Sequence, residues 1–245
     1  MARISLEFYS KSLLRKTEVI VYIPTLNLQG VIQQNDRNYY QNANKQFPLM
    51  LLLGGFGLSK SGWEQQSIVE DLADKYGVAL CMIGGENKWY MNFSPIDMWE
   101  DFLCYEVPDF LFGNFACLNR SNPLWIAGCS MGGYGALRNY LSHIDVFDAC
   151  GVLSPATKAD NNLEEMIHQK TLPTLIEETK DLKKNVYLSV GTKDFIYEPS
   201  KEFDSFLTKV GCGFNYKFVE GYDHSFALWN IEIEEFIKYA LSLTK

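Results

Sequence analysis

The residues best suited to covalent chemistry lie in the segment Gly128-Cys129-Ser130-Met131-Gly132, which has a glycine two positions to either side of one serine. A chain of this length would contain such a G-x-S-x-G pattern by chance about one time in ten. The context strengthens it, because an apolar run ends at Gly128 and a helical pattern begins just after Ser130. A sharp strand-to-helix turn accepts only small neighbours and exposes the hydroxyl at the positive end of the helix. We predict that Ser130 is a nucleophile; the alternative is a glycine-rich turn without chemistry.

A serine hydroxyl becomes a good nucleophile only when a base removes its proton, and histidine does this near neutral pH. The chain contains three histidines, His143, His168 and His224. His143 follows Ser130 by about 13 residues on one predicted helix. At about 1.5 Å per residue this is ~20 Å, too far for a hydrogen bond, so His143 should instead satisfy carbonyls at the helix end. His168 lies in a polar segment and is expected on the surface, with a contact at the rim of the site as the alternative. His224, in a loop between a predicted strand and the last helix, is therefore the predicted base.

The carboxylate that orients the base should follow a strand and lie between the serine and the histidine in the chain. Asp194 meets both conditions, because it comes shortly after the apolar run that ends at Gly191. It would fix the tautomer of His224 and stabilise the imidazolium that forms during catalysis. Glu198, further along the same loop, and Asp223, beside the histidine, remain alternatives.

Acyl transfer places negative charge on a carbonyl oxygen, and two backbone N–H groups aimed at that oxygen would lower the barrier. One donor should be Met131, the residue after the predicted nucleophile. The other should come from the glycine-rich loop that follows the apolar run at 48–54. In that loop we predict Phe56 as the donor, with Gly55 keeping its surroundings open.

The same loop also raises the alternative of a phosphate-binding loop, since GGFGLSKS nearly matches G-x-x-x-x-G-K-[ST] after a strand. Ser59 stands where that pattern needs its second glycine, which lets backbone N–H groups curl around phosphate. This departure disfavours nucleotide binding. The three scattered histidines form no H-E-x-x-H pattern, so the sequence predicts no metal site.

Apolar runs rich in Val, Ile and Leu alternate with longer helical patterns, which predicts one α/β domain over 1–245 with a mostly parallel sheet covered on both faces. Strands are predicted at 4–10, 18–24, 48–54, 78–84, 124–128, 147–154, 186–191 and 214–221, and helices at 67–76, 98–115, 134–142, 201–210 and 226–243. Pro108 is expected to kink or divide the second of these helices. The polar segment 27–46 should form a surface loop or hairpin, and 156–180 a small lid above the sheet.

The composition limits the class of protein further. The 245 residues carry a net charge of −8, which argues against a nucleic-acid partner. No run of about 18 apolar residues occurs, so no membrane span is expected. The first residues lack the apolar block of a signal peptide, and none of the six cysteines forms a C-x-x-C pair. These features predict a cytoplasmic protein with reduced thiols, and they leave a homo-oligomer open.

Four segments together resemble one known family: LLLGGFG with Trp63, GCSMGGYGAL, GTKDFIY and GYDHSFALWN. They are similar to the esterases that include esterase D (S-formylglutathione hydrolase), tributyrin esterases and some feruloyl esterases, and most closely to bacterial tributyrin esterases. The resemblance covers nearly the whole chain. It implies an α/β-hydrolase fold and the hydrolysis of short-chain acyl esters by Ser130, Asp194 and His224, without a cofactor.

The resemblance also places backbone oxyanion donors at Phe56 and Met131. The family commonly has His-Gly where this chain has Gly54-Gly55, and because that histidine is not the base, catalysis should survive its absence. We further predict that Trp63, Trp89 and Tyr90 wall a substrate pocket together with Gly55; ordinary loop packing is the alternative for the three aromatic residues.

The sequence thus predicts a serine carboxylesterase that acts on a small-molecule ester through an acyl-Ser130 intermediate. A carbohydrate acetyl esterase, a feruloyl esterase and an acyltransferase share the same residues and remain alternatives. A hydrolase-like binding module without activity is the non-enzyme alternative.

Overall fold

The computed structural model describes residues 1–26, 28–33, 45–159, 163–182 and 184–243. These residues form an eight-stranded sheet in the order β1-β2-β4-β3-β7-β8-β9-β10. Its strands are β1 (Ala2–Ser10), β2 (Arg15–Ile23), β3 (Leu49–Leu53), β4 (Ala79–Ile83), β7 (Leu124–Cys129), β8 (Ala149–Leu153), β9 (Val186–Gly191) and β10 (Lys217–Val219). β2 pairs antiparallel with both β1 and β4, and the other neighbours in the sheet are parallel. The predicted α/β fold with a mostly parallel sheet is confirmed.

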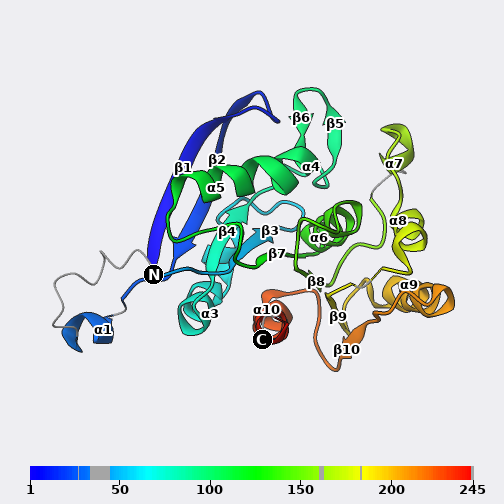
Figure 1. Cartoon of the computed structure of the whole chain (residues 1–245). Helices are drawn as coiled ribbons and strands as arrows, with labels where there is room; N and C mark the ends of the chain where they lie inside the picture. Colours follow the sequence, from blue (N-terminus) through cyan, green and yellow to red (C-terminus); the bar gives the residue numbers. More distant parts are fainter. Residues whose placement is uncertain (27, 34–44, 160–162, 183, 244–245) are drawn as a thin grey trace.

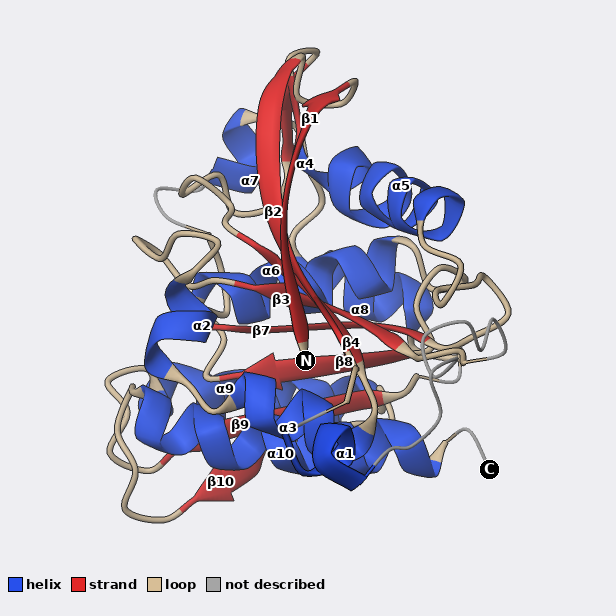
Figure 2. Cartoon of the chain, turned by 90° about the vertical axis from the view of Figure 1, so that its left-hand side faces the viewer, coloured by secondary structure: helices blue, strands red, loops and turns tan. Residues whose placement is uncertain are grey.

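Helices cover both faces of the sheet (Figures 1 and 2). One face packs against α4 (Trp99–Asp101), α5 (Val107–Asn114), α6 (Met131–Ser142), α8 (Leu172–Thr179) and α9 (Tyr197–Val210). The other packs against α2 (Gly62–Gln66), α3 (Val69–Tyr76) and α10 (Phe226–Ser242). The short helices α1 (Leu28–Gln33) and α7 (Leu163–Met166) complete the described set.

The burial of each strand explains its sequence pattern. β3, β4, β7 and β8 are buried along their whole length, so they read as continuous apolar runs. β1 instead alternates between half-buried and exposed residues, as a strand with one face in water does. Because β7, β9 and β10 run parallel, the loops after them emerge at the same edge of the sheet. The predicted catalytic residues all lie in these three loops.

The predicted helix at 98–115 contains a proline and is nevertheless continuous. A π-helical turn (Phe102–Glu106) joins α4 to α5, and Val107 N–H donates to Phe102 O, five residues earlier. Pro108 follows in the first turn of α5. The wider turn accommodates the proline ring, which would clash with the carbonyl of a regular α-helix. The proline therefore changes the local geometry of this helix without dividing it.

Two short elements lie where the sequence predicts loops: α2 and the hairpin of β5 (Asn92–Ser94) and β6 (Asp97–Met98). Both are too short to give a periodic pattern. In the predicted surface segment 27–46 the structure places α1, and residues 34–44 lie outside the described part of the chain.

The predicted lid segment 156–180 carries α7 and α8 and lies beside α6 (Figure 1). Tyr134 on α6 donates to Glu164 Oε1 at 2.8 Å, and Arg138 on the same helix donates to Gln169 Oε1 at 2.7 Å. These bonds hold the segment against α6. Movement of the segment as a lid stays a prediction.

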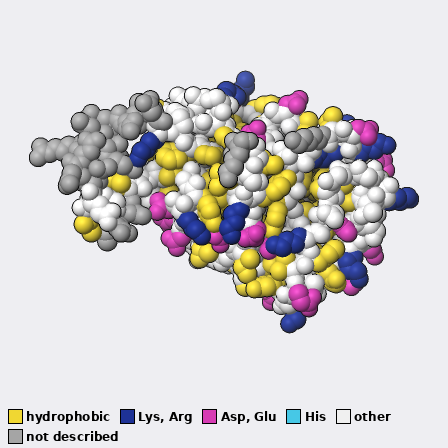
Figure 3. All heavy atoms as spheres, turned by 60° about the horizontal axis from the view of Figure 1, so that its bottom comes forward, with side chains coloured by type: hydrophobic (Ala, Val, Ile, Leu, Met, Phe, Trp, Pro, Cys, Tyr) yellow, Lys and Arg dark blue, Asp and Glu magenta, His cyan; other side chains and the backbone are white. Residues whose placement is uncertain are grey.

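None of the described helices is long and apolar enough to cross a membrane. On the face shown in Figure 3, basic and acidic side chains are interspersed with apolar ones. The described residues on that face form no continuous basic surface, in line with the net charge of −8.

Candidate active site

Ser130 lies at the turn between β7 and α6, where the glycine pattern places it. Its backbone has φ 54° and ψ −120°, a strained conformation for a residue with a side chain. Ser130 N–H donates to Leu153 O at 2.9 Å, and Ser130 O accepts from Tyr134 N–H at 3.0 Å. These bonds fix a partly exposed serine at the N-terminus of α6, where the helix dipole favours negative charge.

Glycine is required on both sides of this turn. A Cβ on Gly128 would lie 2.5 Å from the carbonyl carbon of Gly132, and a Cβ on Gly132 would lie 2.4 Å from Leu53 O. Because all of these neighbours are backbone atoms, they cannot move aside as a flexible side chain would. The two glycines therefore let β7, α6 and β3 approach closely enough to form the turn.

Asp194 and His224 form a hydrogen-bonded pair above the same sheet edge. Asp194 follows β9 and is only 4% exposed, while His224 precedes α10. His224 Nδ1 lies 2.8 Å from Asp194 Oδ2 and 3.0 Å from Oδ1. This contact engages Nδ1 and leaves Nε2 as the nitrogen that can exchange a proton with a nucleophile.

Ser130 and His224 line one cavity of about 680 Å³. The other lining residues are Gly55, Phe56, Leu58, Gln66, Ser225, Phe226, Ala227 and Trp229. None of the described residues that line this cavity is Asp, Glu, Lys or Arg. The volume suits a small molecule, and a lining that mixes polar and apolar side chains without an ionised carboxylate, Lys or Arg favours an uncharged one.

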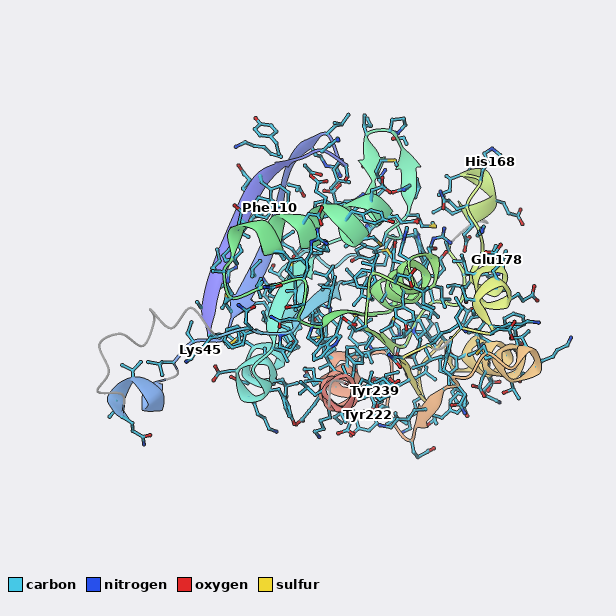
Figure 4. All side chains as sticks on the ribbon, viewed as in Figure 1. Lys45, Phe110, His168, Glu178, Tyr222 and Tyr239 are labelled. Atoms are coloured by element: carbon cyan, nitrogen blue, oxygen red, sulfur yellow. The ribbon has the colours of Figure 1, made fainter. Side chains whose placement is uncertain are left out.

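The other two histidines lie elsewhere. His143, at the end of α6, contacts Glu100 Oε1 at 2.7 Å and Tyr105 Oη at 2.9 Å, so its ring binds side chains and not the helix carbonyls that we expected. His168 is exposed, as predicted. Figure 4 shows it near α7, far from Tyr222, which precedes His224 by two residues.

The two alternative carboxylates are both exposed. Glu198 pairs with Lys201, one turn later on α9, at 3.0 Å. Asp223 accepts a hydrogen bond from Ser225. Of the three candidates, Asp194 is the carboxylate that contacts His224.

The predicted oxyanion loop lies against the nucleophile. A Cβ on Gly55 would be 3.3 Å from Ser130 Cβ, so the glycine allows the loop to approach this closely. Phe56 follows it and is 60% exposed in the cavity, while the side chain of Met131 is buried at the start of α6. The loop is held by Leu58 N–H, which donates to Gly55 O at 3.0 Å, and by Asn87 Oδ1, which accepts from Gly57 N–H at 2.7 Å.

The aromatic residues predicted to wall the pocket instead lie in the core beneath the site. Trp63 is 1% exposed, and its Nε1–H donates to Leu53 O at 2.9 Å. Tyr90 is fully buried, and its hydroxyl donates to Gly54 O at 2.8 Å. Trp89 is 7% exposed and packs edge-on against Tyr134. Trp63 and Tyr90 thus contact the backbone that leads into the predicted oxyanion loop.

Sequence reasoning missed the side chains that surround the base. Phe226 and Trp229, at the start of α10, line the cavity. The ring centroids of Trp229 and His224 are 5.0 Å apart at 87°, and Phe195 lies 4.5 Å from His224 at 53°. All three belong to the segments that carry Asp194 and His224, so proximity in sequence could have indicated them.

The competing phosphate-binding interpretation of the loop at 54–61 gains no support. Lys60, which would hold phosphate, has its ammonium 2.8 Å from Glu18 Oε2 on β2. The helix that follows, α2, has only five residues. Across the described part of the chain, no group of three or more His, Cys, Asp or Glu side chains is placed to hold a metal ion.

Cys129, the neighbour of Ser130, does not compete with it as a nucleophile. The thiol is completely buried, and burial raises its pKa to about 12. Because the thiolate is the reactive form, this cysteine is inert at neutral pH.

Comparison with known proteins agrees with this geometry. The model of the family described as "Putative esterase" matches residues 10–238. The chain belongs to this family. It is therefore a hydrolase of carboxylic ester bonds, with the α/β-hydrolase fold that its structural neighbours share.

Among curated relatives, an acetyl esterase of Caldicellulosiruptor saccharolyticus is 24% identical over 94% of both chains. An S-formylglutathione hydrolase of Arabidopsis thaliana is 27% identical over 70% of this chain and 65% of its own length. Among solved structures, the fluorophosphonate-binding serine hydrolase F of Staphylococcus aureus superposes over 98% of both chains with a TM-score of 0.81 and 21% identity.

Proposed function

We propose that this esterase hydrolyses short-chain acyl esters through a covalent acyl-Ser130 intermediate. The observation that carries the proposal is the Asp194–His224 pair at 2.8 Å, with His224 and Ser130 lining one cavity. The relative named acetyl esterase, which matches along 94% of this chain, supports a short acyl group. A cavity of about 680 Å³ without Asp, Glu, Lys or Arg among its described lining residues suits such substrates.

In the first step, His224 Nε2 accepts the proton of Ser130 Oγ while the oxygen attacks the ester carbonyl carbon. Asp194 holds the imidazole through Nδ1 and stabilises the imidazolium. The backbone N–H groups of Phe56 and Met131 stabilise the charge on the carbonyl oxygen. The imidazolium then gives its proton to the departing alcohol oxygen as the carbon–oxygen bond breaks.

In the second step, water takes the place of the alcohol. His224 removes a proton from the water, and the hydroxide adds to the acyl carbon of acyl-Ser130. The tetrahedral intermediate collapses to release the carboxylic acid, and Ser130 Oγ recovers its proton from His224. Both steps begin with the transfer of a proton to the imidazole of His224.

We also propose that the protein works in the reducing environment of the cytoplasm. All six cysteines are free thiols, and five of them are buried. Whether it forms a homo-oligomer is left to a measurement of its mass in solution.

The test is the hydrolysis of p-nitrophenyl acetate and p-nitrophenyl butyrate by the wild type and by Ser130→Ala. The variant should retain the fold and lose turnover, together with labelling by a fluorophosphonate. His224→Ala should lose activity in the same way, whereas His168→Ala, which changes an exposed histidine near α7, should not. Substantial turnover by well-folded Ser130→Ala would refute the assignment.

A further inference from the structure

An exposed aromatic side chain lies directly on the imidazole of the active site. Phe195 is 76% exposed, and its ring centroid is 4.5 Å from that of His224. An isolated exposed phenylalanine is ordinary. This one is distinguished by its contact with the base and by Phe56, which is 60% exposed in the cavity that His224 also lines.

The position of Phe195 is set by the turn that also presents the orienting acid. Asp194 N–H donates to Gly191 O at 3.2 Å, and Tyr197 N–H donates to Asp194 O at 3.0 Å. Ile196 N–H donates to Asp194 Oδ1 at 3.0 Å. The backbone on both sides of Phe195 is therefore anchored, and its ring faces water beside the imidazole of His224.

The direction of proton transfer indicates which part of an ester meets this ring. Asp194 engages Nδ1 of His224, so Nε2 must deliver the proton to the departing alcohol oxygen. The alcohol part of the ester must then lie beside the imidazole during acylation. Phe195 contacts that imidazole, whereas the acyl carbon must lie over Ser130 Oγ.

We propose that Phe195 is a specificity-determining residue that binds the alcohol part of the ester. The preferred alcohols are flat, apolar and uncharged, aryl alcohols above all, because an aromatic ring packs well on another ring. Phe195 is not among the residues that line the cavity of Ser130 and His224, so it would meet the alcohol part outside that cavity. The cavity itself has no Asp, Glu, Lys or Arg among its described lining residues, which favours an uncharged ester. This inference rests on the proposed function, because it assigns one side of the same ester bond.

The experiment compares two acetates that give the same acyl-enzyme, phenyl acetate and ethyl acetate. Phe195→Ala should lower the ratio of their kcat/KM values, phenyl over ethyl, about three- to tenfold relative to wild type. Phe195→Tyr, which keeps a flat ring, should retain the wild-type ratio. The ratio for p-nitrophenyl acetate over p-nitrophenyl butyrate, which probes the acyl side, should not change in either variant.

The control is Tyr9→Ala, which removes an aromatic side chain of similar exposure (78%) on β1 and should leave both ratios unchanged. An equal loss on both acetates in Phe195→Ala would overturn the proposal, because it would mean that Phe195 only supports His224. A change in the acetate-to-butyrate ratio would also overturn it, because the ring would then contact the acyl chain. If the wild type hydrolysed none of these esters, the proposed function itself would fail; normal wild-type turnover with an unchanged phenyl-to-ethyl ratio in Phe195→Ala would refute the inference alone.

Discussion

The hydroxyl of Tyr90 gives the sharpest test of how the core supports catalysis. It donates to Gly54 O at 2.8 Å, immediately before the predicted oxyanion loop, and lies 3.3 Å from Ile83 O. The side chain is fully buried. Burial raises the pKa of Tyr90 well above its ordinary value, so the hydroxyl keeps its proton wherever the protein is folded. Tyr90→Phe removes this donor and almost nothing else.

The expected magnitudes follow from the burial of this hydrogen bond. A buried carbonyl left without its donor costs about 1–3 kcal/mol. In a chain of this size, a loss of about 2 kcal/mol lowers Tm by roughly 4–8 °C. Complete removal of one oxyanion donor costs about 10²–10³ in kcat. Because Tyr90→Phe loosens the loop without removing Phe56 N–H, we expect kcat to fall about tenfold, or ~1.4 kcal/mol, with little change in KM.

The assay measures kcat and KM for p-nitrophenyl acetate together with Tm. Tyr140→Phe is the matched control, since Tyr140 is also buried and its hydroxyl accepts from Asn185 N–H at 2.9 Å, outside the oxyanion loop. It should lose a similar amount of stability and keep its kcat. The reasoning fails if Tyr90→Phe retains wild-type kcat, or if kcat falls equally in both variants.

Substitutions at three further positions test other parts of the structure. Gly132→Ala forces a Cβ to 2.4 Å from Leu53 O, so it should cost about 3 kcal/mol or more in urea unfolding and abolish turnover. Glu106→Gln should cost about 1–2 kcal/mol of unfolding free energy at pH 7. Burial raises the pKa of Glu106, but hydrogen bonds from the β1–β2 turn outweigh burial and hold the pKa below 4.5. The stabilisation is therefore present above pH 4.5 and disappears as pH falls through the lowered pKa, so the unfolding free energies of the two proteins should converge in acid. Phe56→Pro removes a predicted oxyanion N–H and should lower kcat about 10²-fold or more. Phe56→Ala keeps that N–H, so its kcat should fall much less. Equal losses of kcat in the two variants would contradict a backbone role for Phe56.

Much of the site could be predicted because its residues are constrained by chain order. Ser130 was identified from glycines that a tight turn requires, and the structure shows backbone atoms where any Cβ would have to go. Asp194 and His224 were selected by position after strands and by elimination, and their contact at 2.8 Å agrees with that choice. The four central strands β3, β4, β7 and β8 were recognisable because burial on both faces makes each of them a continuous apolar run.

The pocket wall could not be predicted in the same way. Trp63 and Tyr90 follow strands, as wall residues would, but their polar atoms bond to backbone carbonyls beneath the loop. Sequence pattern gives the element on which a side chain lies, whereas the direction of a loop side chain depends on tertiary packing. Phe195 and Phe226 were missed for the same reason, since each follows a catalytic candidate by only one or two residues and has no periodic neighbour to orient it.

The two polar backbone atoms of Gly54 hold the start of the predicted oxyanion loop. Gly54 N–H donates to Ile83 O at 3.2 Å, and Gly54 O accepts from Tyr90. Both polar backbone atoms of Gly54 are therefore bound by buried groups. A side chain at this position would force Leu58 to shift, because its Cβ would lie 3.2 Å from Leu58 Cβ. The loop backbone is thus fixed from beneath, which is what the predicted role of Phe56 N–H as an oxyanion donor requires.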